Sequence, residues 1–231
     1  MEQDTHTKET FFSDVIKRFK DDGICIFEGN AFTPEQLNYF TSAIDVKSNE
    51  SSDYKFGKSY NTGDVHNWIG TPIWEFATSN FMTGFVHHYF NRPVITDVFL
   101  THEYKNNEGL DRNGFLHFDR LRCVKFFIYL TDCDEESGAF HFVPNSHKHG
   151  KQLREQGSLS YEEDFDENRQ AYETKKNRLV EDFPELGYKN SDAIPIIGKA
   201  GTMFVFDTDL FHFGGKIQEG KERKVMRIHL K

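Results

Sequence analysis

The clearest hydrophobic pattern in the chain is the alternation over residues 123–130. Successive side chains of a strand point to opposite faces, so this segment predicts one strand with two different faces. One face is hydrocarbon throughout and consists of Val124, Phe126, Ile128 and Leu130. We expect helices to cover that face. The other face carries Lys125 among aromatic side chains, and an unpaired buried ammonium is costly. Lys125 should therefore have an exit to water or a partner, which an anionic ligand inside a barrel would supply.

The same alternation predicts strands on both sides of this one. Residues 202–206 and 224–230 form the strongest of them. In the last strand Arg223 and Arg227 share one face, and the opposite face is apolar. Shorter strands are expected at 24–27, at 94–104 and between the acidic turn 132–138 and Pro144.

The sequence predicts three helices in the first 90 residues, the first of them from apolar residues at helical spacing. They cover 10–20, ending at Gly23, then 34 to about 43 with Thr33 as N-cap, and about 72–90. Residues 47–67 are polar and rich in Ser, Asn and Gly, which predicts a long loop.

Residues 148–192 differ from the rest, because nearly all of them are charged or polar. We interpret them as one or two surface helices inserted between barrel strands. Such an insertion could be a lid on the substrate side, and it could equally be a solvent-exposed segment with no role in the site. The length of 231 residues predicts that the chain, 1–231, is a single domain that contains this insertion.

Composition narrows the classes of function. Aromatic residues make up 15% of the chain and include 24 Phe, which predicts a core built of rings. The formal net charge of −9 argues against nucleic acid or an anionic membrane as a partner. The first ten residues are polar, so no signal peptide is expected. Three cysteines without metal-motif spacing favour a reducing cytoplasm.

His117 and Asp119 are candidate metal ligands. Residues at i and i+2 of an extended segment point the same way, so both side chains can reach one point. A second histidine would complete the two-histidine, one-carboxylate set of non-haem iron(II) oxygenases, which leaves positions open for cosubstrate and oxygen. The best candidate is His212, which lies just beyond the strand at 202–206. The structural alternatives are a His–Asp hydrogen bond and a core histidine.

Arg223 follows His212 by eleven residues and opens the last strand. Its guanidinium could clamp a carboxylate through two parallel hydrogen bonds. Arg227 on the same face and Lys125 on the other inward-facing strand are rivals for this role.

Taken in order, these motifs resemble the phytanoyl-CoA dioxygenase family. The motifs are His117-Phe-Asp119, the strand from Lys125, Glu136-Ser-Gly138, Phe142-Val-Pro-Asn-Ser-His147, and His212 with Arg223 behind it. Many members read Pro-Gly-Ser-His where this chain has Pro-Asn-Ser-His, which is a turn substitution. The position of Phe127 often holds a larger aromatic residue in that family, so this departure concerns the shape of the pocket.

The resemblance implies a mainly β fold with flanking helices. This fold is a double-stranded β-helix, a jelly-roll or cupin-like barrel, with the amino-terminal helices packed on one face. It further implies that His117, Asp119 and His212 bind iron(II) and that Arg223 binds the distal carboxylate of 2-oxoglutarate. Lys125 and Phe127 are expected to line the cosubstrate site.

The expected activity is that of an iron(II)- and 2-oxoglutarate-dependent dioxygenase. It would use O2 to hydroxylate a small organic metabolite, releasing succinate and CO2. Related halogenases leave the carboxylate position vacant for chloride. Because Asp119 fills that position, hydroxylation is favoured over halogenation, while desaturation, epoxidation and ring closure remain compatible.

Two other classes of function stay open at this point. The first is a non-catalytic or cupin-like barrel that binds a metal or a small carboxylate. The second is a zinc-dependent or cupin-like isomerase. A separate zinc site from His141, His147 and His149 with Cys133 lacks paired-ligand spacing.

Overall fold

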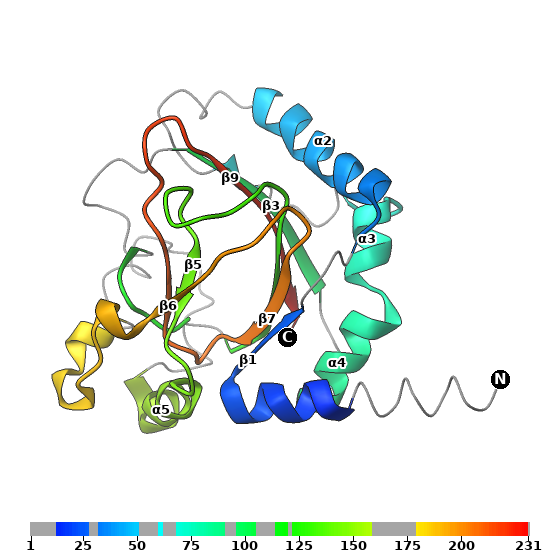
Figure 1. The fold of residues 1–231 in the computed structure, drawn as a ribbon. Coiled ribbons are helices and arrows are strands. Elements are labelled where there is room, and N and C mark those ends of the chain that lie inside the picture. Colours follow the sequence, from blue (N-terminus) through cyan, green and yellow to red (C-terminus); the bar gives the residue numbers. More distant parts are fainter. Residues whose placement is uncertain are drawn as a thin grey trace, which may run out of the picture.

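The computed structural model describes residues 13–27, 32–50, 60–61, 68–90, 96–104, 114–119, 122–158 and 179–230. The fold is mainly β with helices, and its strands form two antiparallel sheets (Figure 1). The larger sheet has the order β1-β7-β4-β9-β3-β2, and the smaller has the order β6-β5-β8.

Six strands lie in segments where the sequence predicts strands, whereas the short strands at 60–61, 194–196 and 212–214 were not predicted. The strands are β1 (Ile24–Phe27), β2 (Tyr60–Asn61), β3 (Thr96–Glu103), β4 (Val124–Tyr129), β5 (Phe140–Phe142), β6 (Ile194–Ile196), β7 (Met203–Asp207), β8 (His212–Gly214) and β9 (Arg223–Leu230). In the larger sheet β4 lies between β7 and β9, and β9 pairs along its whole length with β3. The short β2, a two-residue strand, lies in the segment 47–67 that was expected to be a loop.

Helices cover one face of the larger sheet (Figure 1). They are the helix at 13–22, α2 (Pro34–Glu50), α3 (Pro72–Ala77) and α4 (Asn80–Phe90). The hydrocarbon face of β4 packs on them: the ring of Phe126 meets the ring of Phe85 at 5.5 Å in an edge-to-face contact. The expectation that helices cover this face is confirmed, and the buried residues of both layers form one cluster.

Two helix boundaries differ from the predictions. The segment 72–90 is two helices because Thr78 and Ser79 interrupt it: the Thr78 hydroxyl donates to the Trp74 carbonyl, and the Ser79 hydroxyl lies 3.5 Å from the Met82 amide at the start of α4. Short hydroxyl side chains compete with helical backbone bonds in this way. Helix α2 runs beyond residue 43 to Glu50, and the fully buried Ile44 anchors part of this extension.

Between the two sheets lies a second apolar cluster made largely of rings. Phe140 of β5 contacts Phe204 and Phe206 of β7 at 5.1 and 4.8 Å, and Phe127 of β4 packs against all three. The aromatic core expected from the composition is therefore present, and it forms one wall of the space that contains the candidate site.

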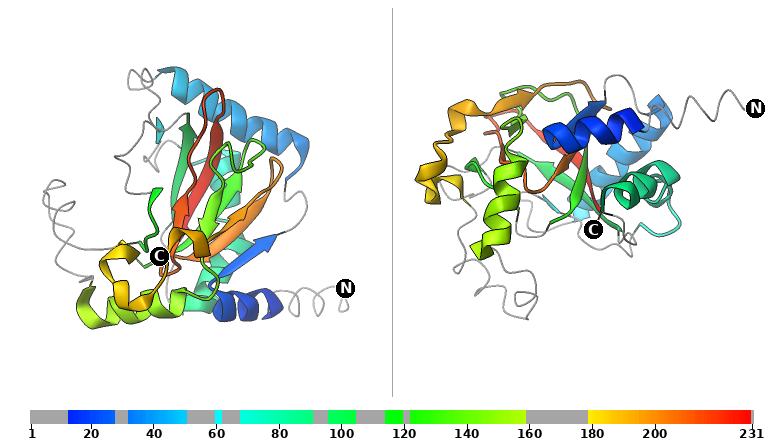
Figure 2. Two further views of the ribbon diagram at one scale, coloured as in Figure 1. Left: turned by 60° about the vertical axis from the view of Figure 1, so that its left-hand side comes forward. Right: turned by 90° about the horizontal axis from the view of Figure 1, so that it is seen from below.

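The segment 148–192 is described in part. It begins in α5 (His147–Leu153), continues into a π-helical turn (Arg154–Ser158), and ends in three short 3-10 turns over 180–192. These pieces gather at one end of the sheets, away from α2 (Figure 2). Residues 159–178 lie outside the described part, so the predicted surface insertion stays a prediction, as does the single-domain assignment.

Among the described residues, none of the helices combines the length and the apolar character needed to cross a membrane.

Candidate metal centre

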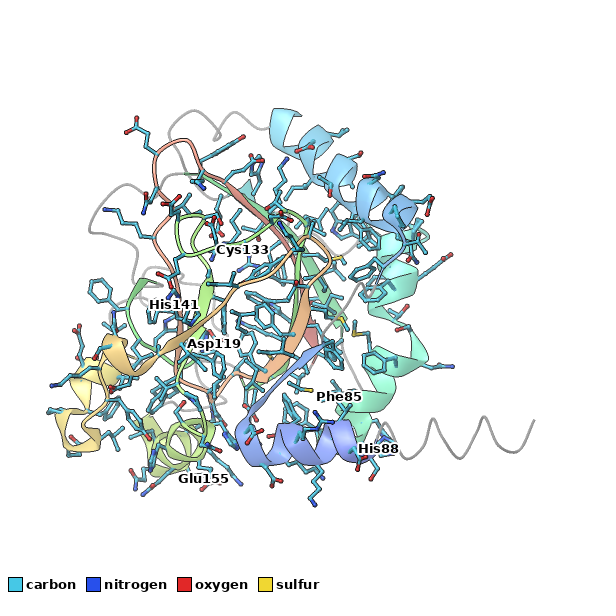
Figure 3. All side chains as sticks on the ribbon, viewed as in Figure 1. Phe85, His88, Asp119, Cys133, His141 and Glu155 are labelled. Atoms are coloured by element: carbon cyan, nitrogen blue, oxygen red, sulfur yellow. The ribbon has the colours of Figure 1, made fainter. Side chains whose placement is uncertain are left out.

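His117 and His212 are backbone neighbours although 94 residues separate them in the chain. The His117 amide donates to the His212 carbonyl at 3.0 Å, and the His212 amide donates back at 2.8 Å. Two residues on, the Asp119 amide donates to the carbonyl of Thr208 at 2.8 Å. These bonds tie the segment before β4 to the segment that leads into β8. They bring the three predicted ligands together between the sheets, where Figure 3 shows Asp119.

The ligand atoms of the three side chains lie within 4.8 Å of one another. Nδ1 of His117 lies 2.7 Å from the Phe115 carbonyl, and Nδ1 of His212 lies 2.7 Å from the Leu210 carbonyl. A carbonyl can only accept, so each Nδ1 carries the hydrogen and each neutral ring keeps a lone pair on Nε2. Carbonyl contacts of this kind fix the orientation of metal-binding histidines. The two rings are thus prepared to bind a cation through Nε2.

Asp119 is held ionised by its neighbours. Its Oδ2 lies 2.6 Å from Lys125 Nζ and 3.7 Å from His212 Nε2. Burial raises the pKa of this carboxyl, but the ammonium of Lys125 outweighs burial and brings the pKa below its usual range. Lys125 therefore has the partner that its position required, and this partner is a candidate metal ligand. Its predicted contact with 2-oxoglutarate stays a prediction.

Arg223 lies at the opposite end of the inner face, where β9 pairs it with Glu103 of β3. Its Nε is 2.7 Å from the Glu103 carboxylate, its Nη2 contacts the same oxygen, and its Nη1 donates to the Gly138 carbonyl. A β carbon added to Gly214 would lie 3.2 Å from Nη2. The guanidinium therefore rests against β8, two residues beyond His212.

Phe127 and Arg227 are cross-strand neighbours on the same inner face. Phe127 belongs to the ring cluster, whereas the Arg227 guanidinium lies over the ring of Phe99 at 5.6 Å. Burial lowers the pKa of Arg227. The structure thus brings Arg223, Arg227, Phe127 and Lys125 to one interior face, as the alternation predicts.

In the part of the chain that the structure describes, the histidines outside this group form no second cluster with metal-compatible spacing. His141 stacks on Phe213 at 4.5 Å, and His149 contacts the Tyr188 hydroxyl at 2.7 Å. Within the described ranges, His117, Asp119 and His212 are the group found with metal-compatible spacing.

Sequence reasoning missed three charged residues of this region: Glu103, Arg154 and Asp209. Glu103 gains its role from the register between β3 and β9, which the sequence does not reveal. Arg154 lies in the polar segment that we interpreted as surface, yet its side chain is buried and bonded to Asp209. A sequence signal for Asp209 existed in the Asp-Thr-Asp run before His212.

Several solved structures share this fold. HygX from Streptomyces hygroscopicus, with nickel and 2-oxoglutarate bound, superposes with a TM-score of 0.61 at 15% identity, over 94% of this chain and 85% of its own. SnoN, an epimerase in complex with Fe3+, alpha ketoglutarate and nogalamycin RO, gives 0.61 at 14% identity, over 96% and 84%. SnoK, a carbocyclase from nogalamycin biosynthesis, gives 0.64 at 13% identity, over 94% and 82%.

A search of curated proteins found no match to this sequence. The family model of phytanoyl-CoA dioxygenase matches residues 19–225, which is most of the chain. The matched range includes every candidate ligand. This chain therefore belongs to the phytanoyl-CoA dioxygenase family.

Proposed function

We propose that this protein is a non-haem iron(II)- and 2-oxoglutarate-dependent dioxygenase that hydroxylates a small organic metabolite and releases succinate and CO2. The observation that carries the proposal is the convergence of His117, Asp119 and His212, whose ligand atoms lie within 4.8 Å. The cofactors are those of the family: iron(II), 2-oxoglutarate and oxygen.

The residues present fit iron. Two neutral imidazoles and one ionised carboxylate suit a divalent first-row metal, and three protein ligands on one side leave room for other ligands. When bound, iron and 2-oxoglutarate supply the oxygen chemistry, and the protein supplies binding and orientation. In this proposal the Phe115 and Leu210 carbonyls orient the histidine rings, and Lys125 keeps Asp119 ionised.

Arg223 is the proposed partner of the distal carboxylate of 2-oxoglutarate. A guanidinium has five N–H donors. Glu103 engages Nε and Nη2, and the Gly138 carbonyl engages Nη1, so two donors remain. Gly214 has no side chain and leaves this end of the guanidinium accessible from β8. The buried rings of Phe140 and Phe206 and the partly buried ring of Phe127 line the interior and limit the access of water, which would compete with the reaction.

Hydroxylation is the reaction that we propose for this iron site. Asp119 fills the carboxylate position, which is incompatible with a halide taking that place. The fold also hosts an epimerase and a carbocyclase, so the products of turnover identify the reaction. We further propose that the two sheets form the double-stranded β-helix that the family resemblance implies, within a single domain.

A small molecule is the proposed substrate. HygX has been solved with hygromycin B bound, and the net charge of −9 opposes nucleic acid as a partner. All three cysteines are buried free thiols, which agrees with the cytoplasmic location predicted from the sequence.

The test is oxygen-dependent conversion of 2-oxoglutarate to succinate by protein loaded anaerobically with iron(II). We expect wild type to bind one iron per chain and to form succinate, and we expect His117→Ala and His212→Ala to lose both properties. His88→Ala, which removes an exposed histidine of α4, is the matched control and should behave as wild type. Unchanged iron affinity and succinate formation in the two ligand variants would refute the assignment. Screening metabolite pools for compounds that accelerate succinate formation then identifies the substrate.

A second candidate is a non-catalytic or cupin-like barrel that binds a metal or a small carboxylate. It is favoured by one observation: Arg223 already has a carboxylate partner, Glu103. The same assay separates the two candidates, because such a barrel binds metal without producing succinate.

A further inference from the structure

We propose that Arg154 is a positioning residue for the iron site, because its guanidinium ties the backbone of Asp119 to the segment that leads into His212. The proposal rests on the proposed function. It concerns a residue of the polar segment 148–192, which sequence reasoning treated as surface.

The contacts of Arg154 connect two ligand-bearing segments. Its Nη2 lies 2.5 Å from the carbonyl oxygen of Asp119, and its Nε lies 2.6 Å from Oδ1 of Asp209. The side chains of Arg154 and Asp209 are 6% and 1% exposed, so both charges are buried together. A buried guanidinium with a carboxylate and a carbonyl on different nitrogens makes a rigid bridge, because its donors are fixed in one plane.

Helix α5 delivers Arg154 to this place. Gly150 packs so closely on the loop before β8 that an added β carbon would lie 1.9 Å from the Asp209 carbonyl oxygen. At the start of the helix, the Ser146 hydroxyl accepts the amide of Phe211 at 2.8 Å. The helix is therefore fixed to the segment 209–211 at two points that precede Arg154 in the chain.

The bridge completes the restraint on Asp119. The Asp119 amide is bonded to the Thr208 carbonyl, and its own carbonyl is bonded to Arg154, which Asp209 holds. Both backbone polar groups of this ligand thus depend on residues 208–209, a few positions before His212. Changing the bridge should alter how Asp119 and His212 face one another.

Arg122 provides a matched comparison. Its Nε lies 3.4 Å from Asp209 Oδ2 and its Nη2 lies 3.8 Å from Asp207 Oδ2. Arg122 therefore contributes positive charge to the same pair of aspartates from another side. A variant at Arg122 disturbs the buried charges, whereas a variant at Arg154 also removes the bond to Asp119.

The experiment is an anaerobic titration of iron(II) into Arg154→Met, Arg154→Lys and Arg122→Met, with thermal unfolding of the metal-free proteins in parallel. Loss of residues that orient metal ligands typically weakens metal binding about 10- to 100-fold. We expect a loss of this size in Arg154→Met, a smaller loss in Arg154→Lys, and unchanged affinity in Arg122→Met. The charge-transfer band of the iron–2-oxoglutarate complex should shift in Arg154→Met, which loss of stability alone would not cause.

A double variant distinguishes bridging from charge balance. In Arg154→Met with Asp209→Asn, no carboxylate is left without its arginine, so thermal stability should recover in part, but iron affinity should stay low. Recovery of iron affinity to the wild-type value, or unchanged affinity in Arg154→Met, overturns the proposal. If wild type itself binds no iron, the proposed function fails instead, so the two failures are distinguishable.

Discussion

Arg223 and Lys125 serve two different ends of the interior. Lys125 lies 2.6 Å from Asp119 at the metal end. Arg223 lies with Glu103 and Gly138, beside the strand that continues from His212. A planar guanidinium with donors to spare suits a second carboxylate, whereas the ammonium already serves the candidate ligand. This arrangement favours Arg223 over Lys125 as the clamp for 2-oxoglutarate.

We therefore predict opposite profiles for the two alanine variants. Arg223→Ala leaves a buried carboxylate without its partner, which costs on the order of 3 kcal/mol. That cost corresponds to about hundredfold weaker binding of 2-oxoglutarate, with iron binding retained. Lys125→Ala should lose less affinity for 2-oxoglutarate. It should bind iron more weakly, because the ammonium that orients the carboxylate of Asp119 is gone. Anaerobic titration of 2-oxoglutarate into iron-loaded protein, followed by the charge-transfer band, measures the affinity for 2-oxoglutarate in both variants. A larger loss in Lys125→Ala would show that the clamp is misassigned.

Glu103→Gln is the complementary variant for Arg223. It keeps an oxygen that can accept from the guanidinium but removes a negative charge near the distal carboxylate of 2-oxoglutarate. Like charges a few ångströms apart in a partly buried site repel, so we expect about tenfold tighter binding. Weaker binding would mean that Glu103 acts mainly by orienting Arg223.

Alternation in the sequence identified which residues face inward, because the face of a strand is a local property. It could not identify their partners. Arg223 meets Glu103, and Phe127 meets Arg227, through strand pairings that join distant parts of the chain. The anionic partner expected for Lys125 was a bound ligand, yet the structure supplies Asp119. The sheet face on which a strand residue lies was thus predictable, whereas the register between paired strands was not.

At the scale of elements, Gly23 is the point where the first helix, β1 and α5 meet. It ends the helix at 13–22 with φ of +77°, a left-handed conformation that favours glycine. It also faces His147 of α5, whose ring would lie 2.5 Å from an added β carbon. The sequence predicted the helix end and helices within 148–192, but it did not predict that α5 packs against Gly23.

This double role predicts different costs for two glycine variants. Gly220 has the same φ of +77° but nothing within 4 Å of an added β carbon. Gly220→Ala should therefore show the conformational cost alone, about 1 kcal/mol. Gly23→Ala should lose roughly 1–3 kcal/mol more, because His147 must move. Urea unfolding of both variants measures the difference, and equal losses would show that the contact with His147 is easily relieved.

The strands were more predictable than the helices for a physical reason. A strand such as β4 is defined by alternation along its own sequence, and its predicted and observed bounds nearly coincide. The end of α2 depends instead on the burial of Ile44 by other elements, and the break before α4 depends on two hydroxyl groups. The polar helix α5 is held by contacts of Gly150 and Ser146 as well as by the buried Leu153, and its sequence does not reveal the first two.

At the scale of the whole molecule, a buried charge network joins the helical layer, the larger sheet and the turn that follows α5. Asp207 at the end of β7 accepts from the Tyr89 hydroxyl of α4 at 2.5 Å. Asp209 follows it and binds Arg154 of the segment after α5, and Arg122 lies near both aspartates. Two carboxylates share this site, so their ionisation bears on the stability of the entire fold.

The stability of the chain should therefore depend on pH through Asp209. Burial first, and then the neighbouring Asp207, raise the pKa of Asp209 to about 6, against about 3.9 in an unfolded chain. The folded state binds more protons than the unfolded state between these values. The contribution of Asp209 is thus fully present below about pH 4 and is lost as the pH rises to about 6.

Asp209→Asn removes this loss, so the variant should gain stability relative to wild type as the pH rises. Between about pH 4.5 and 6.5, we expect the difference in free energy of unfolding to move on the order of 2 kcal/mol in favour of the variant. Burial lowers the pKa of His102 and of His147, which destabilises both proteins in acid. That effect is common to wild type and variant, so it cancels in the comparison. Urea unfolding of both proteins across this range measures the difference, and a difference that does not vary with pH would place the raised pKa elsewhere in the network.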